Sequence, residues 1–151
     1  MRTLAVALVL AAVAAAPAAA ARPVSGPALL AIDGHAGFRN YLPTRMLPGF
    51  EYARWSYRNG VLRVDFHSKS GRTVVWSVRP MDGACSNGKL ASYQLAGNKV
   101  WWGMDEASQF AWRCVFGLDG KPLRLQASST TPPTALAGAG LGIVVASATR
   151  Y

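Results

Sequence analysis

Asp65 and His67 are the two residues whose types and spacing come closest to acid–base chemistry. They lie two positions apart in an expected β-strand, so their side chains point to the same side of a sheet. A histidine beside a carboxylate is a common general base. Neighbouring side chains on one strand face stand roughly 7 Å apart, however, which is beyond direct hydrogen bonding. Arg54 is expected opposite Asp65, and Thr73, expected opposite His67, has no activating partner. We therefore predict no catalytic residue here, only a surface histidine and a cross-strand ion pair.

Other catalytic and metal motifs are missing from the sequence. It has no phosphate-binding glycine loop, nucleophile elbow or paired-histidine motif, so we expect no cofactor. A zinc site at Cys85 and Cys114 would need two further donors, and His35 and His67 do not have the spacing of a zinc motif. We predict instead that the two cysteines form one disulfide, and we predict no metal site. A secreted hydrolase without a sequence signature stays an alternative, because catalytic triads are defined by geometry.

Aromatic and basic side chains on one face of the expected sheet favour binding over catalysis. Tyr52, Arg54 and His67 are expected on the face away from the main apolar side. Trp101 is expected on the same face of a later hairpin, because adjacent strand residues point to opposite sides and Trp102 is expected inside. These four are the predicted ligand-binding residues, for an anionic or amphipathic molecule. The alternative is that the N-terminal segment or the C-terminal tail covers the Trp101 indole.

The first residues of the chain predict export. A positive start at Met1 and Arg2, an uncharged stretch over residues 4–15 and small residues over 17–21 are typical of a cleaved signal peptide over 1–21. We therefore expect a secreted or periplasmic protein with no transmembrane segment after cleavage. The alternative is that residues 4–21 stay as an anchor, since this length is near the lower limit for a membrane-spanning helix.

The charge balance favours anionic partners. The chain has 16 lysines and arginines against 7 acidic residues, a formal net charge of +9, and loss of Arg2 with the signal peptide would lower it by one. Such a charge attracts acidic envelope polymers and anionic headgroups, although it also serves solubility alone. The basic residues are scattered singly, whereas nucleic-acid footprints cluster them, so we expect no nucleic-acid partner.

Turn residues and alternating apolar positions predict a mainly β fold. Residues 22–49 are expected to be a lead-in with a short helix over 36–42 and an irregular, proline-braced stretch over 42–49. Residues 50–151 are expected to form one antiparallel meander of about seven strands that curls into a half-barrel or sandwich. A three-residue loop at 69–71 and three two-residue turns join the strands, and the turns are Asn59-Gly60, Gly97-Asn98 and Asp119-Gly120. Residues 134–148 fit a helix or a strand, and we favour a short helix followed by a last strand.

These turns also predict the strand registers. In the first hairpin, Ala53 would face Phe66, and Tyr52 would face His67. Downstream, Tyr93 would face Trp102, and Trp112 would face Ala127. One common apolar face would then gather four tryptophans and four other aromatic residues, namely Trp55, Trp76, Trp102, Trp112, Tyr57, Tyr93, Phe66 and Phe116.

The function expected from the sequence is exported, non-enzymatic binding in the cell envelope or outside the cell, by a monomer. Its partner would be an anionic envelope component or an exported protein. Besides the hydrolase, an exported enzyme inhibitor stays an alternative. Its inhibitory loop would be the disulfide-tethered stretch 82–89 or the braced stretch 42–48 around Arg45.

Overall fold

The computed structural model of the chain describes residues 22–23, 41–86, 89–105, 108–129 and 135–150. The expected signal peptide over 1–21 lies outside the described residues, as do positions 36–40 of the expected N-terminal helix.

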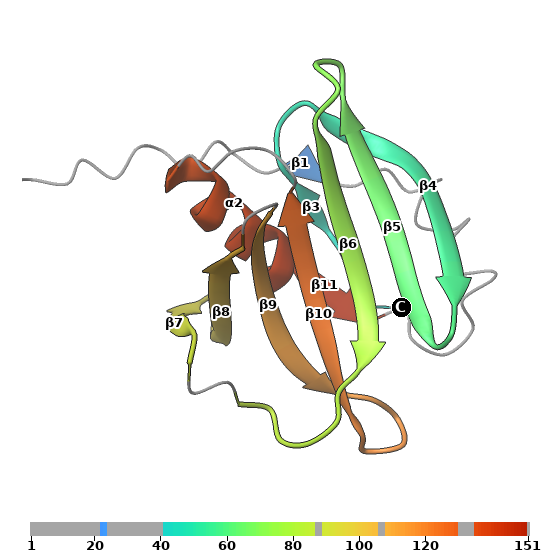
Figure 1. The fold of residues 1–151 in the computed structure, drawn as a ribbon, viewed down its shortest axis with the longest axis vertical. Helices are drawn as coiled ribbons and strands as arrows, with labels where there is room; N and C mark the ends of the chain where they lie inside the picture. Colours follow the sequence, from blue (N-terminus) through green and yellow to red (C-terminus); the bar gives the residue numbers. More distant parts are fainter. Residues whose placement is uncertain (1–21, 24–40, 87–88, 106–107, 130–134, 151) are drawn as a thin grey trace, which may run out of the picture.

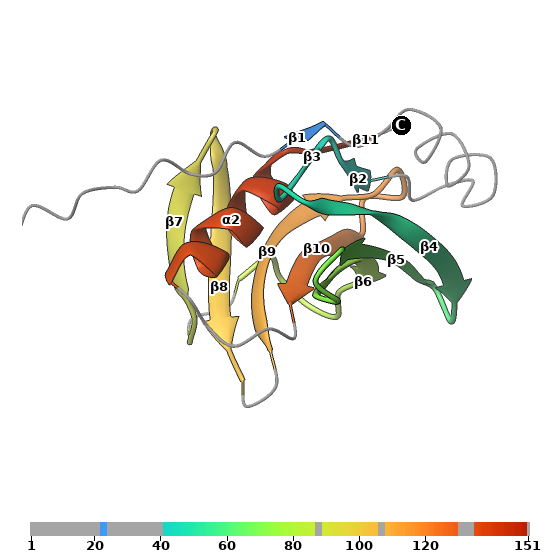
Figure 2. The same cartoon turned by 90° about the horizontal axis from the view of Figure 1, so that it is seen from above.

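A curled antiparallel sheet of seven strands forms the body of the fold (Figure 1). The strands run in the order β4-β5-β6-β10-β9-β8-β7, so two meanders meet where β6 pairs with β10. The mainly β antiparallel fold is confirmed, and the sheet curls without closing into a barrel (Figure 2). Its strand order differs from one continuous meander, because β10 rather than β7 is the neighbour of β6. The strands are β4 (Phe50–Arg58), β5 (Val61–Ser68), β6 (Thr73–Pro80), β7 (Ala91–Leu95), β8 (Asn98–Met104), β9 (Gln109–Phe116) and β10 (Pro122–Ser129).

The hollow of the curled sheet holds the C-terminal segment (Figure 2). Helix α2 (Ala135–Ala146) is followed by strand β11 (Ala148–Arg150), which confirms the expected helix and last strand. Two glycines of α2 allow close packing: a Cβ at Gly142 would lie 1.7 Å from the Tyr93 hydroxyl oxygen, and one at Gly140 would lie 2.6 Å from Leu47 Cδ2. Gly142, which weakens the helix by its propensity, therefore lets it approach the sheet at β7, and Gly140 lets it approach the segment before β4.

The segment before β4 is extended rather than helical where the structure describes it. Strand β2 (Tyr41–Pro43) pairs with β11, so the expected helix is wrong at its C-terminal end, where Leu42 lies opposite Thr149. Strand β3 (Arg45–Met46) pairs with β1 (Arg22–Pro23). The backbone N–H of Arg45 also donates to Ser147 Oγ at 3.1 Å. Residues 41–46 are thus held by strands near both ends of the described chain, β1 and β11.

The first two turns of the sheet are as predicted. Asn59 and Gly60 have φ of 51° and 77°, the left-handed values of a two-residue hairpin turn. In the next loop Gly71 has φ of 79°, and Ser68 N–H donates to Arg72 O at 2.9 Å. These turns place Val64 opposite Trp76, which is fully buried and donates its indole N–H to Tyr41 O at 2.9 Å.

A β-bulge in β4 overturns one predicted register. The pairing shifts between Tyr52 and Arg54, so Tyr52 lies opposite Phe66, and the predicted Tyr52–His67 and Ala53–Phe66 pairs are wrong. The two rings make an edge-to-face contact with centroids 6.4 Å apart. Tyr52 therefore packs on the core side of the sheet, because the extra residue of a bulge reverses the side chains beyond it.

Two downstream turns also differ from the prediction. Ala96 and Gly97, with φ of 48° and 75°, form the turn between β7 and β8, which places Tyr93 opposite Val100 instead of Trp102. Between β9 and β10 the loop has three residues, because Gly117 N–H donates to Lys121 O at 2.9 Å. This shift by one residue turns Trp112 to the other face, together with Cys114 and Phe116.

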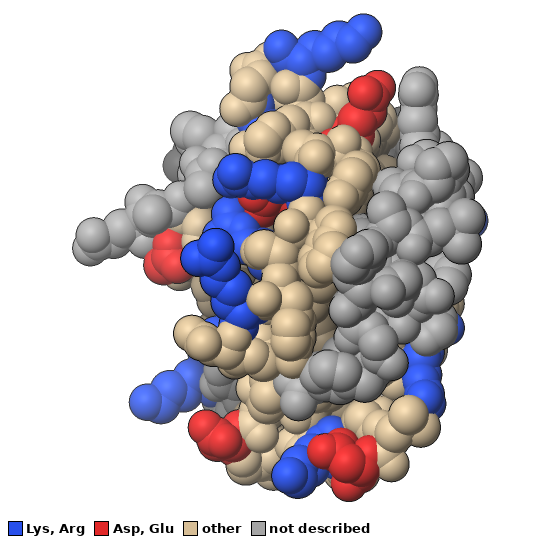
Figure 3. Space-filling view, turned by 90° about the vertical axis from the view of Figure 1, so that its right-hand side faces the viewer, with Lys and Arg blue, Asp and Glu red and all other residues tan. Residues whose placement is uncertain are grey.

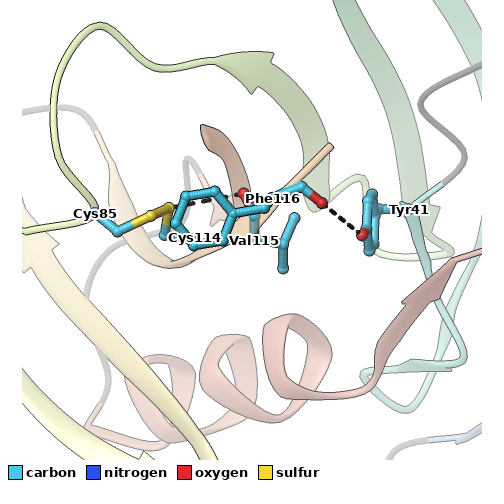
Figure 4. The surroundings of a disulfide bond; sticks show 5 residues. All are labelled: Tyr41, Cys85, Cys114, Val115 and Phe116. Atoms are coloured by element: carbon cyan, nitrogen blue, oxygen red, sulfur yellow. Dashed lines mark hydrogen bonds between the residues drawn. A yellow bond between two sulfur atoms is a disulfide. The ribbon is translucent and has the colours of Figure 1, made fainter. Parts of the chain in front are cut away.

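The predicted disulfide between Cys85 and Cys114 is present, with the two Cα atoms 5.5 Å apart (Figure 4). It tethers the connection between β6 and β7 to strand β9. Two residues further along β9, Phe116 O accepts a hydrogen bond of 3.2 Å from the Tyr41 hydroxyl, which ties the end of the strand to β2.

Candidate anion-binding site

The sheet has an inner face, which packs on α2, and an outer face, which points away from it. Side chains alternate between the two faces along each strand. Beyond the bulge in β4, Trp55 and Tyr57 pack on the core of the inner face. Arg54, Ser56 and Arg58 consequently point to the outer face, as do Arg63, Asp65 and His67 of β5.

A buried carboxylate holds two arginines on this face. Asp65 Oδ2 accepts a hydrogen bond of 2.8 Å from Arg54 Nε, and Oδ1 accepts one of 2.7 Å from Arg63 Nε. The Asp65 side chain is 4% exposed, whereas those of Arg54 and Arg63 are 75% and 51% exposed. The predicted Arg54–Asp65 ion pair is thus confirmed, and Arg63 is a second partner that we did not predict.

Asp65 stays ionised because of its two partners. Burial by itself raises the pKa of its carboxyl, but the hydrogen bonds and positive charges of Arg54 and Arg63 outweigh burial and hold the pKa below its usual value. A buried charge is tolerable only when it is paired in this way. Asp65 therefore fixes the position of both guanidinium groups at neutral pH.

A cleft of about 280 Å³ opens beside this ion-pair cluster. Figure 3 shows the basic side chains gathered around a small acidic patch on this side of the molecule. Three arginines and one carboxylate contribute the charges, so the cleft is positive overall. Its lining residues are Arg54, Trp55, Ser56, Arg58, Arg63 and Asp65.

The guanidinium groups retain unused donors. Arg54 and Arg63 each donate to Asp65 through Nε. In the part of the chain that the structure describes, their Nη atoms have no hydrogen-bond partner. Planar Nη pairs suit the two oxygens of a carboxylate or phosphate. Because Asp65 already fixes the guanidinium planes, little side-chain entropy is lost on binding. The arrangement can therefore hold an anionic group without any chemical step.

The other predicted ligand-binding residues lie outside the cleft. His67 is exposed on the outer face, opposite Glu51 and Thr73. Tyr52 packs on the inner face beside Phe66, for the reason given above.

Trp101 lies on the outer face as predicted, but on β8, five strand spacings from β4, which is about 24 Å measured along the curled sheet. It is 5% exposed and stacks on Trp112, with ring centroids 4.4 Å apart. The Lys99 ammonium lies 5.2 Å from the centroid of its ring. Trp101 is thus part of a packed aromatic pair rather than of the cleft.

Sequence reasoning missed Arg58 and Arg63, although a signal was present. Both follow the alternation that places Arg54 and Asp65 on the outer face, and the confirmed turn at Asn59-Gly60 aligns the two strands. Counting charges by strand face rather than along the chain would have shown this cluster.

No helix among the described residues is long and apolar enough to cross a membrane. Within the same residues, no group of three or more His, Cys, Asp or Glu side chains is placed to hold a metal ion. Comparison with known proteins found no matching family model, no similar curated protein and no similar solved structure.

Proposed function

We propose that this protein is an exported, non-enzymatic binding protein that holds an anionic group in the cleft between β4 and β5. The observation that carries the proposal is the pair of guanidinium groups that a buried Asp65 fixes through their Nε atoms and that both line an open cleft. Ligand sites commonly combine a concave surface with a few well-placed polar groups. The disulfide supports the exported compartment, because disulfides persist in oxidising environments.

The ligand group is a carboxylate, phosphate or sulfate, because these anions accept two parallel hydrogen bonds from arginine. Arg58 adds a third positive charge to the cleft, and Ser56 adds a hydroxyl donor.

The test is an NMR titration that follows the Nε–H signals of the arginines and the backbone amides. Galacturonate supplies the carboxylate and inorganic phosphate supplies the phosphate. We expect shifts in β4 and β5 that saturate, and we expect Arg63→Gln to abolish them. Lys69→Gln removes a charge from the exposed loop after β5, outside the cleft, and should leave the shifts unchanged.

Two results would refute the proposal. One is the absence of saturable shifts with both probes. The other is binding that persists in a folded Arg63→Gln protein.

A further inference from the structure

The positive charge of the cleft continues across the sheet on the outer face. Arg79 of β6 and Arg124 of β10 lie directly opposite each other. Both belong to the outer face, because their neighbours Val78 and Leu125 are fully buried on the inner face. Arg58 lies opposite Val61 of β5. The next residue of β5, Leu62, lies opposite Val78, so Val61 is level with Arg79 of β6. Arg58, Arg79 and Arg124 therefore fall in one row across the strands.

The resulting arginine band comprises Arg54, Arg58, Arg63, Arg79 and Arg124, on the neighbouring strands β4, β5, β6 and β10. Asp65 is the one carboxylate on the outer face in the rows of residues that contain these five arginines. Glu51 lies further along β4, opposite His67. The band ends at Cys114, the partner of Arg124 on β9, where the disulfide tethers Cys85.

Two like charges face each other within the band, and such a pair destabilises a sheet. Burial, together with the charge of Arg79, lowers the pKa of Arg124 to about 10, so Arg124 remains charged at neutral pH. The Arg124 guanidinium carbon lies 4.6 Å from the centroid of the Trp112 ring. Its Nε is buried without a hydrogen-bond partner in the described part of the chain. Nothing described in the fold neutralises this pair, whereas a bound polyanion would.

We propose that the arginine band binds a linear acidic polysaccharide, which lies across the strands with one carboxylate in the cleft and further carboxylates at Arg79 and Arg124. This inference rests on the proposed function, because the cleft is one end of the band. From β4 to β10 the band spans three strand spacings, about 14 Å, which is longer than one monosaccharide. Ser77, between Arg63 and Gln126 in the next row, adds a hydroxyl on the path of the chain.

The aromatic side chains of this face decide between a polysaccharide and a nucleic acid. Proteins that bind single-stranded nucleic acid stack bases on exposed aromatic rings. Trp112 is 1% exposed and Trp101 5%, and Arg124 lies over Trp112. Arg124 also lies over Phe110, and the exposed Phe116 lies opposite Pro122, outside the arginine band. The band itself therefore offers charge and hydroxyl groups but no open stacking platform, which fits a polyanion without bases.

The experiment compares ligands of different length. Galacturonate and its tetramer are titrated into the full folded chain and into Arg79→Gln, Arg54→Gln and Lys69→Gln, with unfolding midpoints measured for each variant. We expect the tetramer to bind more tightly than the monomer, because its carboxylates engage several arginines at once. Arg79→Gln should weaken tetramer binding about tenfold and leave monomer binding unchanged. Arg54→Gln should weaken both, and Lys69→Gln neither.

The outcomes separate this inference from the proposed function. If Arg79→Gln has no effect on the tetramer while Arg54→Gln weakens the monomer, the band is refuted and the cleft stands. If neither ligand depends on Arg54, both ideas fail. If a thymidine oligonucleotide binds as tightly as the tetramer and depends equally on Arg79, the ligand is a nucleic acid and the polysaccharide assignment is overturned.

Discussion

Replacing Asp65 by asparagine tests whether one buried carboxylate organises the cleft. The substitution keeps the size of the side chain but removes its charge, and it places an N–H₂ group against an arginine donor. One of the two contacts, to Arg54 Nε at 2.8 Å or to Arg63 Nε at 2.7 Å, must then be lost. In the other contact the acceptor is a neutral amide oxygen instead of a carboxylate oxygen. We expect the variant to fold with lower stability.

The magnitude follows from the exposure of the partners. A hydrogen bond to a charged group contributes about 1.5–3 kcal/mol. Arg54 and Arg63 are more than half exposed, however, so water screens both pairs. We therefore discount each contact to about 1 kcal/mol. The expected loss in the free energy of unfolding of Asp65→Asn at pH 7 is therefore about 1–2 kcal/mol, since one contact is lost and the other is weakened.

The pH dependence gives this prediction a second signature. The pKa of Asp65 is lowered in the folded state, so its contribution to stability is fully present above its unfolded pKa of about 3.9 and is lost as the pH falls through the folded pKa. The difference between the native protein and Asp65→Asn should therefore shrink as the pH is lowered below 4. At the lowest pH both proteins carry a neutral side chain at this position.

The assay is urea unfolding followed by tryptophan fluorescence, from pH 7 downward. Glu51→Gln makes the same acid-to-amide change at an exposed site on β4 and should alter stability by no more than about 0.5 kcal/mol. A difference for Asp65→Asn that is as small as that of the control at pH 7 would refute the argument. So would a difference that stays constant on acidification.

Two further predictions concern the packing and covalent linkage of the fold. Gly142→Ala should lower the free energy of unfolding by about 1–3 kcal/mol, despite the higher helix propensity of alanine, because its Cβ meets the Tyr93 hydroxyl at 1.7 Å. The Cβ of Gly140→Ala meets only the flexible end of Leu47, so this variant should lower the free energy of unfolding less. Thermal unfolding of both variants checks the prediction, and equal effects of the two would contradict it. Replacing both Cys85 and Cys114 by serine should cost about 3–4 kcal/mol in urea unfolding, since the bond joins positions 29 residues apart. A reducing agent should destabilise the native protein to the same level and leave the double variant unchanged, and a native protein insensitive to reduction would contradict the prediction.

The sequence predicted those parts of the fold where the turn chemistry allows one solution. Asn59-Gly60 suits a two-residue turn and little else, so it fixed the pairing of β4 with β5 as far as Arg54 and Asp65. Asp119-Gly120 is less restrictive. It fits a two-residue turn, but also a three-residue loop with Gly120 in the left-handed position, and the structure has the latter. Because the loop has three residues rather than two, Trp112 lies on the outer face instead of the predicted inner face.

The strand order and the bulge were beyond local reasoning. The neighbour of β6 depends on contacts between residues distant in the chain, and neither alternation nor turn residues report them. No characteristic residue type marks the position of the bulge in β4, so Tyr52 was assigned to the wrong face. For the candidate site, Arg54 and Asp65 were predictable from one hairpin, whereas the juxtaposition of Arg79 with Arg124 required the strand order.

The position of the disulfide bears on how two copies of this chain would interact during folding. A protein assembled from two meanders that meet along one seam can exchange a meander between molecules, if the connecting segment opens as a hinge. Here Cys85, in that connecting segment, is bonded to Cys114 of the second meander, so the bond would move with that meander and leaves residues 81–84 as the hinge. Oxidation thereby shortens the hinge about which the two meanders could exchange, and reduction lengthens it.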